Sequence, residues 1–465
     1  MQEKKAFRVP ESTVLLFAIL IIAALLTFII PANKYDLQVK EDGTVSKLID
    51  PDSYHPIDPA PQDPWKMMKA IPKGFNNASG IIFFTMFIVG SFSIITATGT
   101  IESILRKILV ALRGKEIIMI SVSVLVFGLI GAGFGIMEVG LVFIPILITM
   151  SLALGYDSMV GISLALVSAC AGAAAGFVQS LLAIAQDIVG LPAFSGMSFR
   201  VVEWIVLMLT IIIYIYFYGK KLKANPELSP SYHEDKQIER LNLDDTDVSM
   251  TGRQKIIGVV VLLGFALLIF GVVTYKWSLT ELVALFLSMG IISGIIGGMK
   301  GEDIVNVFLE GIKPVMIGIL AIGLGRAVLE VLEAGGILHT IVHSMASVVA
   351  GLPGALQVVG MYIVQLIISI VIPSGSGMAV VTMPIMGPLA SILGITQQTA
   401  VIIFQMADCF TNIIVPTSGM LMAALAISKV SFTKWFKWYM PLFLILVLEG
   451  AIFSIIAYAI KLGPF

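Results

Sequence analysis

Long apolar runs, broken by short turns and by two long polar stretches, make up most of this 465-residue chain. A helix that spans a lipid bilayer needs about 20 predominantly apolar residues, and many of the runs are that long. In the first half they cover roughly residues 13–31, 79–97, 116–134, 141–153, 159–177, 180–190 and 199–218. In the second half they cover roughly residues 256–274, 279–298, 312–332, 356–373, 378–393, 397–415, 418–428 and 436–460. The pattern predicts an all-α polytopic membrane protein.

Some of the apolar runs are too short to cross a bilayer. The run from Leu141 to Ala153 has about thirteen residues, where a spanning helix needs about twenty. In transporters, short segments interrupted by Gly or Pro at corresponding places of two halves mark the binding site. The short runs therefore indicate a chain built from two related halves.

The two halves share a sequence pattern. Residues 140–155 (GLVFIPILITMSLALG) align without a gap on residues 379–394 (AVVTMPIMGPLASILG), which superposes Pro145 on Pro384. Upstream, residues 98–114 resemble residues 334–351. Chance similarity between two hydrophobic stretches is the alternative explanation. We predict a first repeat over 1–218 with an outer loop at 32–76, a cytoplasmic linker over 219–255 and a second repeat over 256–465.

The positive charges indicate how the halves lie in the membrane. Lys and Arg mark the cytoplasmic side of membrane proteins, so the basic linker and the N-terminus, with Lys4, Lys5 and Arg8, are both expected there. Segment 98–115 carries basic residues, whereas its counterpart 334–351 has no Lys or Arg. Equivalent segments then lie on opposite sides of the membrane, and we predict that the repeats are inverted. The basic residues of the first copy are Arg106, Lys107, Arg113 and Lys115.

The composition supports the bilayer as the main solvent. Hydrophobic residues make up 58% of the chain and charged residues 13%, and the mean hydropathy is +0.99. A net charge of −1 gives no support for binding of nucleic acid. Cys170 and Cys409 each lie inside an apolar run. They are expected to be small buried side chains, and we predict no metal site.

Each half contains an apolar arm that runs to a glycine-rich tip and returns, at 127–145 and at 369–384. Non-helical backbone at membrane depth is tolerated where it lines a wet cavity. Its free N–H groups and the flanking helix ends bind anions such as carboxylates. A glycine-rich packing motif between helices is the alternative. The predicted substrate-binding residues at the tips are Met137, Glu138, Gly140, Ser374, Gly375, Ser376 and Gly377.

A helix that is also interrupted follows each tip. In segment 404–426, Pro416 removes a backbone donor, and Asp408 and Asn412 share one helix face just before this break. The matching segment 169–187 has small residues up to Gly176, which indicate close helix packing. The predicted substrate-binding residues of the two interrupted helices are Gln179, Ser180, Asn412, Thr417 and Ser418.

Ionisable side chains inside apolar segments are functional candidates. We predict that Glu138 and Asp408 serve ion coupling. Glu138 has two alternatives, contact with an amino group of the substrate or a structural ion pair, and Asp408 has one, hydrogen bonds to structural hydroxyls. Arg326 is either a buried partner of the site or paired locally with Glu330, and the local pair is favoured. Glu203, His339 and His343 are expected at the membrane interface and have no assigned role.

Three motifs resemble a known family: FGIMEVGLVFIP, SGSGMAVVTMPIMGPLA and QMADCFTNIIVPTSGMLMAAL. They are similar to the YfcC-like members of the anaerobic four-carbon-dicarboxylate carrier family, within the ion transporter superfamily, over nearly the whole chain. The resemblance implies inverted repeats with paired re-entrant hairpins, a scaffold that forms a homodimer, and elevator-type movement of a transport domain. It also implies a multi-pass protein of the bacterial cytoplasmic (inner) membrane. Superfamily relatives commonly carry Asn or Ser-Asn-Thr at the hairpin tips, and this chain does not.

We therefore predict a secondary active transporter, either an ion-coupled carrier or an exchanger, for a small carboxylate-bearing metabolite. An amino acid such as arginine or ornithine is favoured, because Glu138 and Asp408 would repel a plain dianion unless coupled Na⁺ or H⁺ neutralised them. A four-carbon-dicarboxylate carrier is the alternative. A channel is the alternative of another class, but paired dead-end tips suit alternating access better than a continuous pore. The chain has no nucleophile motif or metal-ligand spacing, so we predict no enzyme activity and no cofactor.

Overall fold

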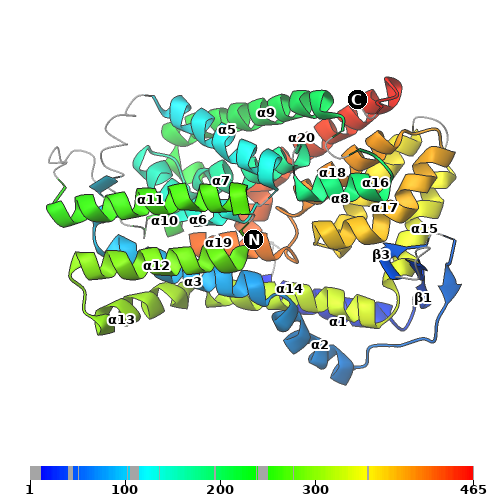
Figure 1. Cartoon of the computed structure of the whole chain (residues 1–465), viewed down its shortest axis with the longest axis horizontal. Helices are drawn as coiled ribbons and strands as arrows, with labels where there is room; N and C mark the ends of the chain where they lie inside the picture. The colour runs from blue at the N-terminus through cyan, green and yellow to red at the C-terminus, as the bar shows by residue number, and fades with distance from the viewer. Residues whose placement is uncertain are drawn as a thin grey trace, which may run out of the picture.

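The computed structural model is nearly all-helical, as the apolar runs predict (Figure 1). It describes residues 12–39, 45–50, 52–101, 103–104, 115–135, 137–177, 179–192, 195–236, 238, 250–275, 277–352 and 356–463. Lys4, Lys5, Arg8, Arg106, Lys107 and Arg113, on which part of the predicted orientation rests, lie outside these ranges. Six helices in the described part are long and apolar enough to cross a membrane: Ser79–Ala97, Glu116–Gly133, Met197–Ala224, Leu279–Gly297, Gly375–Ile392 and Phe432–Ala459.

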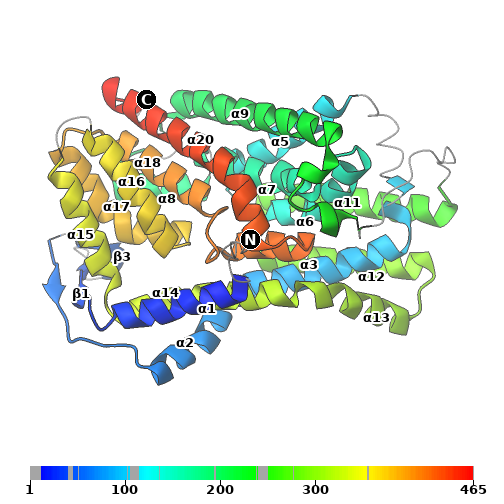
Figure 2. The same ribbon diagram turned by 180° about the vertical axis from the view of Figure 1, so that it is seen from behind.

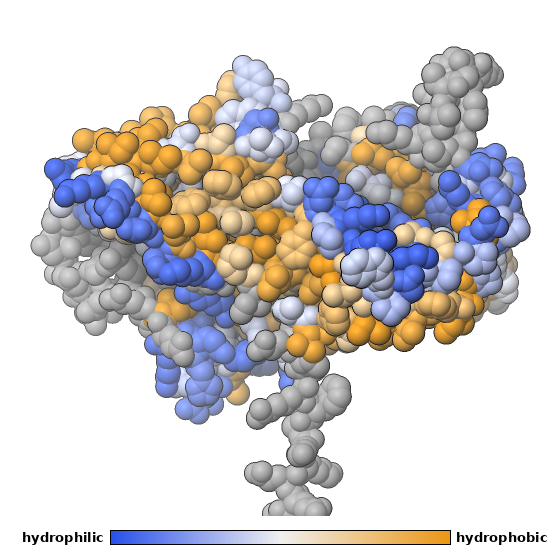
Figure 3. Space-filling view, turned by 90° about the horizontal axis from the view of Figure 1, so that it is seen from below, coloured by the Kyte–Doolittle hydropathy of each residue, from blue (hydrophilic) through white to orange (hydrophobic). Residues whose placement is uncertain are grey.

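The surface is apolar enough to face lipid. Figure 3 shows broad hydrophobic areas along one side of the molecule, interrupted by hydrophilic patches. Leu262, Ile295 and Leu448 are each more than half exposed, at 67%, 62% and 61%. Exposure of so many large apolar side chains would be unfavourable in water and costs nothing in hydrocarbon. The described part of the chain therefore has the surface of a membrane protein.

Two helix groups lie along the lower part of the molecule in Figure 1. In one group α14 packs against α1 and α2, and in the other α3 packs against α12 and α13. Each group combines an apolar helix, a short amphipathic helix and a helix that leads toward the cavity described below. Helix α11 lies along α12. The bounds are α1 Ser12–Leu26, α2 Pro64–Asn77, α3 Ser79–Ala97, α11 Gly252–Tyr275, α12 Leu279–Gly297, α13 Gly301–Ile312, η2 Lys313–Val315 and α14 Met316–Ala334.

The remaining helices form the larger part of the molecule (Figure 2). Helix α7 packs against α5, α6 and α9, and α18 packs against α16, α17 and α20. Two short helices each pack on a helix of the other half of the chain: α8 packs on α17, and α19 packs on α6. The bounds are α5 Glu116–Phe134, α6 Val139–Ala153, α7 Ser158–Ala174, α8 Ser180–Ile188, α9 Met197–Ala224, α15 Leu338–Ala350, α16 Leu356–Val371, α17 Gly375–Ile392, α18 Gln397–Thr411, α19 Gly419–Ser428 and α20 Phe432–Ala459.

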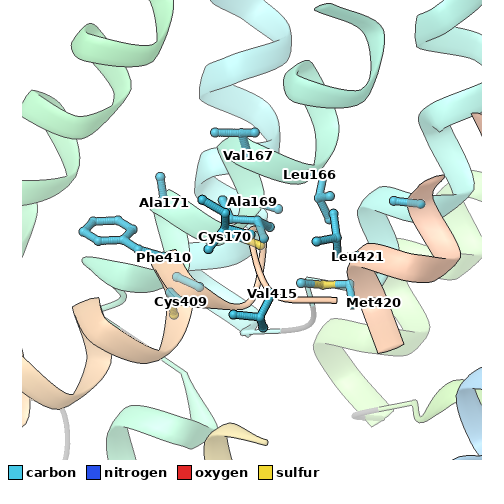
Figure 4. Close-up of a cluster of buried hydrophobic side chains, with 14 of the residues drawn as sticks. Leu166, Val167, Ala169, Cys170, Ala171, Cys409, Phe410, Val415, Met420 and Leu421 are labelled. Atoms are coloured by element: carbon cyan, nitrogen blue, oxygen red, sulfur yellow. The ribbon is translucent and has the colours of Figure 1, made fainter. Parts of the chain in front are cut away.

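The core lies where α7 and α18 meet (Figure 4). Every residue of α7 and nearly every residue of α18 is buried. Cys170 and Cys409 lie in this cluster, both buried as predicted. Gly172 of α7 touches the backbone of α5 so closely that a Cβ atom there would lie 2.1 Å from the carbonyl oxygen of Gly128. The small residues at the end of α7 therefore serve close helix packing, which confirms that prediction.

The last part of the predicted outer loop at 32–76 forms helix α2, which the sequence did not predict. Asp63 caps this helix by accepting hydrogen bonds from the amides of Trp65 and Lys66, and Pro64 occupies its first turn. Gly74 packs against the backbone of α14. The rest of the loop has two short antiparallel pairs, β1 (Asn33–Lys34) with β4 (His55–Pro56) and β2 (Leu37–Val39) with β3 (Val45–Ile49).

The linker also begins later than the predicted boundary at residue 218, since α9 continues to Ala224 and its last turns carry the lysines. The linker then forms η1 (Pro226–Leu228) and α10 (Tyr232–Asp235). Asp235 accepts hydrogen bonds from Ser158 and Ser231. These contacts fix the start of the linker to the turn between α6 and α7.

Candidate functional site

The first hairpin is interrupted between α5 and α6, within the predicted tip. Gly135 ends α5 with a φ of 67°, a left-handed conformation that favours glycine. A Cβ atom at Gly135 would also lie 2.5 Å from Oε1 of Gln179. Met137 and Glu138 follow, and α6 starts at Val139. Two separate constraints thus require glycine at this position.

The second hairpin is interrupted earlier than the sequence predicts. The non-helical residues between α16 and α17 are Ile372, Pro373 and Ser374, whereas Gly375, Ser376 and Gly377 form the first turn of α17. Of the four predicted tip residues from Ser374 to Gly377, only Ser374 is therefore non-helical. The first intrahelical bond runs from Met378 N to Ser374 O, so the three preceding amides have no partner within the helix. Such a helix N-terminus still favours an anion.

The break between α18 and α19 places Asp408 beside this second tip. Oδ1 of Asp408 accepts a hydrogen bond from Nδ2 of Asn412 at 3.0 Å. Oδ2 is buried and has no hydrogen-bond partner among the described residues. A Cβ atom on Gly375 would lie 2.7 Å from this oxygen. The carboxylate of Asp408 therefore faces the start of α17 with one oxygen free to bind a cation or a donor.

The break between α7 and α8 is held by Gln179, a predicted site residue, and by Gln405 and Arg200, which the sequence did not single out. Gln179 and Gln405 both donate to the carbonyl oxygen of Ala173, each at 2.7 Å. Nη1 of Arg200 donates to Oε1 of Gln405 at 2.6 Å. Arg200 and Glu203 are fully buried inside the protein, and the expected position of Glu203 at the membrane interface stays a prediction. The signal in the sequence is the i, i+3 pair of opposite charges inside an apolar run, which indicates a buried face of α9.

These breaks surround a cavity of about 410 Å³, in the size range of small-molecule sites. The predicted residues that line it are Met137, Glu138, Ser374, Gly375, Ser376, Asp408, Asn412, Thr417 and Ser418. Three predicted residues are absent from its lining, Gly140, Gln179 and Gly377, and the side chain of the fourth, Ser180, lies outside the described part of the chain. Gly140 instead packs against Ala165, and Gln179 is turned to the backbone of α7.

Helices α2, α3 and α14 complete the cavity with residues that the sequence did not assign to it. Asn77, Ile81, Ile322 and Arg326 belong to its lining. Nε of Arg326 lies 3.7 Å from Oε1 of Glu330, so the predicted local pair is present. Arg326 also lines the cavity, so α14 brings a cation to the site in addition to the local pair.

Comparison with known proteins places the chain in a family. The model of DcuC, the C4-dicarboxylate anaerobic carrier family, matches residues 9–459. The chain belongs to this family. A relative in Escherichia coli (strain K12), YfcC, provisionally named a basic amino acid antiporter, is 29% identical over 470 residues that cover 93% of each chain. An uncharacterised protein of Haemophilus influenzae is 30% identical over 500 residues that cover 98% of each chain.

Two solved structures of transporters are similar to this family member along nearly its whole length. Neisseria gonorrhoeae MtrF, described with a class of antimetabolite efflux pumps, is 17% identical with a TM-score of 0.41, over 98% of this chain and 96% of that one. The Alcanivorax borkumensis YdaH transporter is 14% identical with a TM-score of 0.44, over 98% of this chain and 99% of that one.

Proposed function

We propose that this carrier is a secondary active transporter that moves a small carboxylate-bearing metabolite, with an amino acid such as arginine or ornithine as the favoured substrate. The observation that carries the proposal is the cavity into which both hairpin tips and the α18–α19 break converge. The name of the Escherichia coli relative supports a basic amino acid. The family description supports the alternative, a four-carbon dicarboxylate.

The charges around the cavity favour a substrate with both signs of charge. The N-terminal turn of α17, with Ser376, offers unpaired amides and a hydroxyl to a carboxylate. At the start of α19 the hydroxyl of Ser418 accepts from the amide of Leu421 and can still donate to a carboxylate. Glu138 and Asp408 line the same cavity and would repel a second carboxylate. A basic amino acid brings its own positive charge. A dicarboxylate would require coupled cations to neutralise these two side chains.

We further propose that Glu138 and Asp408 couple transport to Na⁺ or H⁺. The free Oδ2 atom of Asp408 is available to a proton or to one ligand position of a sodium ion. Carboxylates are the usual carriers of coupled protons inside membrane proteins. An exchanger without a coupled ion is the alternative, and it would use the same side chains to bind the cationic part of the substrate.

The architecture proposed for transport is a pair of inverted repeats in which one body moves against the other. The packing of α1 and α2 on α14 corresponds to that of α12 and α13 on α3, and the packing of α8 on α17 corresponds to that of α19 on α6. These matched pairs support a duplicated fold, with α11 unmatched among the described helices. A homodimer in the bacterial inner membrane with a cytoplasmic N-terminus completes the proposal.

A thermal-shift screen of the purified protein tests the substrate class. The probes are L-arginine, L-ornithine, succinate and fumarate, each with and without sodium. A ligand at 100 times its Kd stabilises the folded state by about 2.7 kcal/mol. We expect the basic amino acids to raise the melting temperature. If only succinate or fumarate raised the melting temperature, the substrate would be a dicarboxylate and not an amino acid.

A further inference from the structure

Three buried polar atoms around the cavity lack hydrogen-bond partners in the described part of the chain. They are Nε of Arg326, Oγ1 of Thr417 and Oδ2 of Asp408, and all three residues line the cavity. Buried polar groups in folded proteins are nearly always hydrogen-bonded, so a cluster of exceptions in one cavity indicates a place where a ligand completes the bonding. Two of the atoms are on charged groups of opposite sign.

Arg326 is held beside the α18–α19 break by close backbone packing. Its neighbour Gly325 lies against Thr417, and a Cβ atom at Gly325 would lie 2.8 Å from the carbonyl oxygen of Thr417. Arg326 and Thr417 therefore approach the cavity from adjoining positions on α14 and the break. Both side chains line the same cavity, so it offers a cation and a free hydroxyl, a combination of donors that suits a carboxylate.

Glu330 does not satisfy the guanidinium of Arg326. The 3.7 Å separation between Nε and Oε1 is too long for a hydrogen bond. The same Oε1 atom accepts a hydrogen bond from Nδ2 of Asn77 at 2.6 Å. Glu330 is thus bonded to α2 and balances the charge of Arg326 only at a distance. The guanidinium keeps Nε free for another acceptor.

We propose that Arg326 is the specificity-determining residue that binds the carboxylate of the transported metabolite, together with the hydroxyl of Thr417. This inference rests on the proposed function, since it concerns the same cavity. A carboxylate at Arg326 lies on the α14 side, and Asp408 lies on the α18 side, so a substrate or a co-bound ion with positive charge fits between them. An amine without a carboxylate would leave Arg326 unpaired and bind weakly.

Probe pairs that differ only in the carboxylate test this inference. The pairs are L-ornithine with putrescine, L-arginine with agmatine, and succinate with the diamide succinamide, in binding measurements on the parent protein and on Arg326→Gln, Arg326→Lys and Glu330→Gln. The parent should prefer the carboxylate member by about 10- to 100-fold, the range of a charge-assisted hydrogen-bonded pair. Arg326→Gln should abolish the preference, and Arg326→Lys should retain part of it. Glu330→Gln, which keeps the guanidinium, should retain the preference.

The outcomes separate this inference from the proposed function. If Arg326→Gln binds with the parent's preference, Arg326 does not contact the carboxylate, although the transporter proposal stands. If the parent binds succinate but neither amino acid, the amino-acid proposal is wrong and the succinate pair tests Arg326 in the same way. If the parent binds no carboxylate-bearing probe at all, both proposals are overturned.

Discussion

Gly375 and Asp408 belong to different helices and touch in the wall of the cavity. Gly375 opens α17, and its missing side chain leaves room for the free oxygen of Asp408. The sequence predicts both residues as part of the site, because one lies in a Ser-Gly-Ser-Gly motif and the other is an acid in an apolar helix. Their contact could not be predicted from the sequence, because no spacing rule relates residues on separate helices. The position of Arg326 at the cavity also could not be predicted, because its i, i+4 spacing to Glu330 favoured a local ion pair.

Gly375→Val is expected to abolish transport while the protein stays folded and inserted. The new side chain would collide with the carboxylate of Asp408, because even a Cβ atom comes within 2.7 Å of Oδ2. Gly377→Ala is the matched control, since its Cβ atom meets only Ser374, at 3.1 Å from Oγ. Uptake into proteoliposomes measures both variants. Parent-like uptake by Gly375→Val would show that this contact is packing and not part of the site.

Ser376→Ala should have a mild effect. If its hydroxyl binds the substrate, the loss of one neutral hydrogen bond weakens affinity by about 0.5–1.5 kcal/mol. Isothermal titration with the probe that stabilises the parent most measures this change. An unchanged Kd would show that the hydroxyl of Ser376 does not bind the substrate and that only its backbone amide can do so.

Asp408→Asn should remove the dependence of transport on sodium or pH and change substrate affinity little. Asn412 can still donate to the Oδ1 position, so the break keeps its local hydrogen bond. Initial uptake rates at several sodium concentrations and pH values measure the dependence. A variant that keeps the parent's ion dependence but loses affinity for amino-bearing substrates would assign Asp408 to the substrate and not to coupling.

At the scale of elements, the interrupted helices were predictable and the amphipathic ones were not. Gly and Pro within apolar runs locate the breaks at Gly135, Ser374 and Pro416 to within a few residues. Helices α2 and α13 carry charges through their length, so they resemble loops by hydropathy alone. The linker was also hard to predict. Its first residues are polar, yet buried hydrogen bonds to Asp157 and Asp235 hold them on the helical body.

Asp157, in the turn between α6 and α7, should make the stability of the protein depend on pH. Burial raises its pKa from 3.8 to about 6, although hydrogen bonds from Tyr218, from the amide of Val160 and from Ser229 oppose the rise. The folded state then holds this proton more tightly than the unfolded state, so the free energy of unfolding increases as the pH falls through 6. Between pH 7 and pH 5 the contribution is about 1 kcal/mol.

Thermal unfolding in detergent at pH 5 and pH 7 measures that contribution. Asp157→Asn should lose about 1 kcal/mol of the parent's gain in stability between pH 7 and pH 5, because the amide does not titrate. Glu227→Gln is the control, since Glu227 belongs to the same linker and is exposed. If Asp157→Asn keeps the full pH dependence of the parent, the stabilisation comes from another group.

At the scale of the whole molecule, the fold class and the family could be predicted from the sequence. Hydropathy alone gives a polytopic helical protein, and the tip and break motifs carry the resemblance to the carrier family that the family model confirms. The walls of the cavity could not be predicted, because they depend on how α14 packs on α2 and α19. The inverted arrangement of the two halves stays a prediction.

Labelling of single cysteines tests that arrangement. One cysteine is placed at Lys115, before α5, and the other at Leu352, between α15 and α16, each in a background without Cys170 and Cys409. If the hairpins enter from opposite faces, a membrane-impermeant maleimide added from outside should label only the variant at Leu352. Labelling of both positions from one side of the membrane would contradict the inverted repeats.

The central claim is that the cavity serves a carrier that alternates between the two sides of the membrane. Counterflow in proteoliposomes tests it most directly, with liposomes preloaded with the unlabelled probe that stabilises the protein most and given the radiolabelled probe outside. The account predicts uptake that saturates with external concentration and requires the internal substrate. Uptake that rises linearly without saturation, or ohmic single-channel currents in a planar bilayer, would contradict a carrier and indicate a continuous pore.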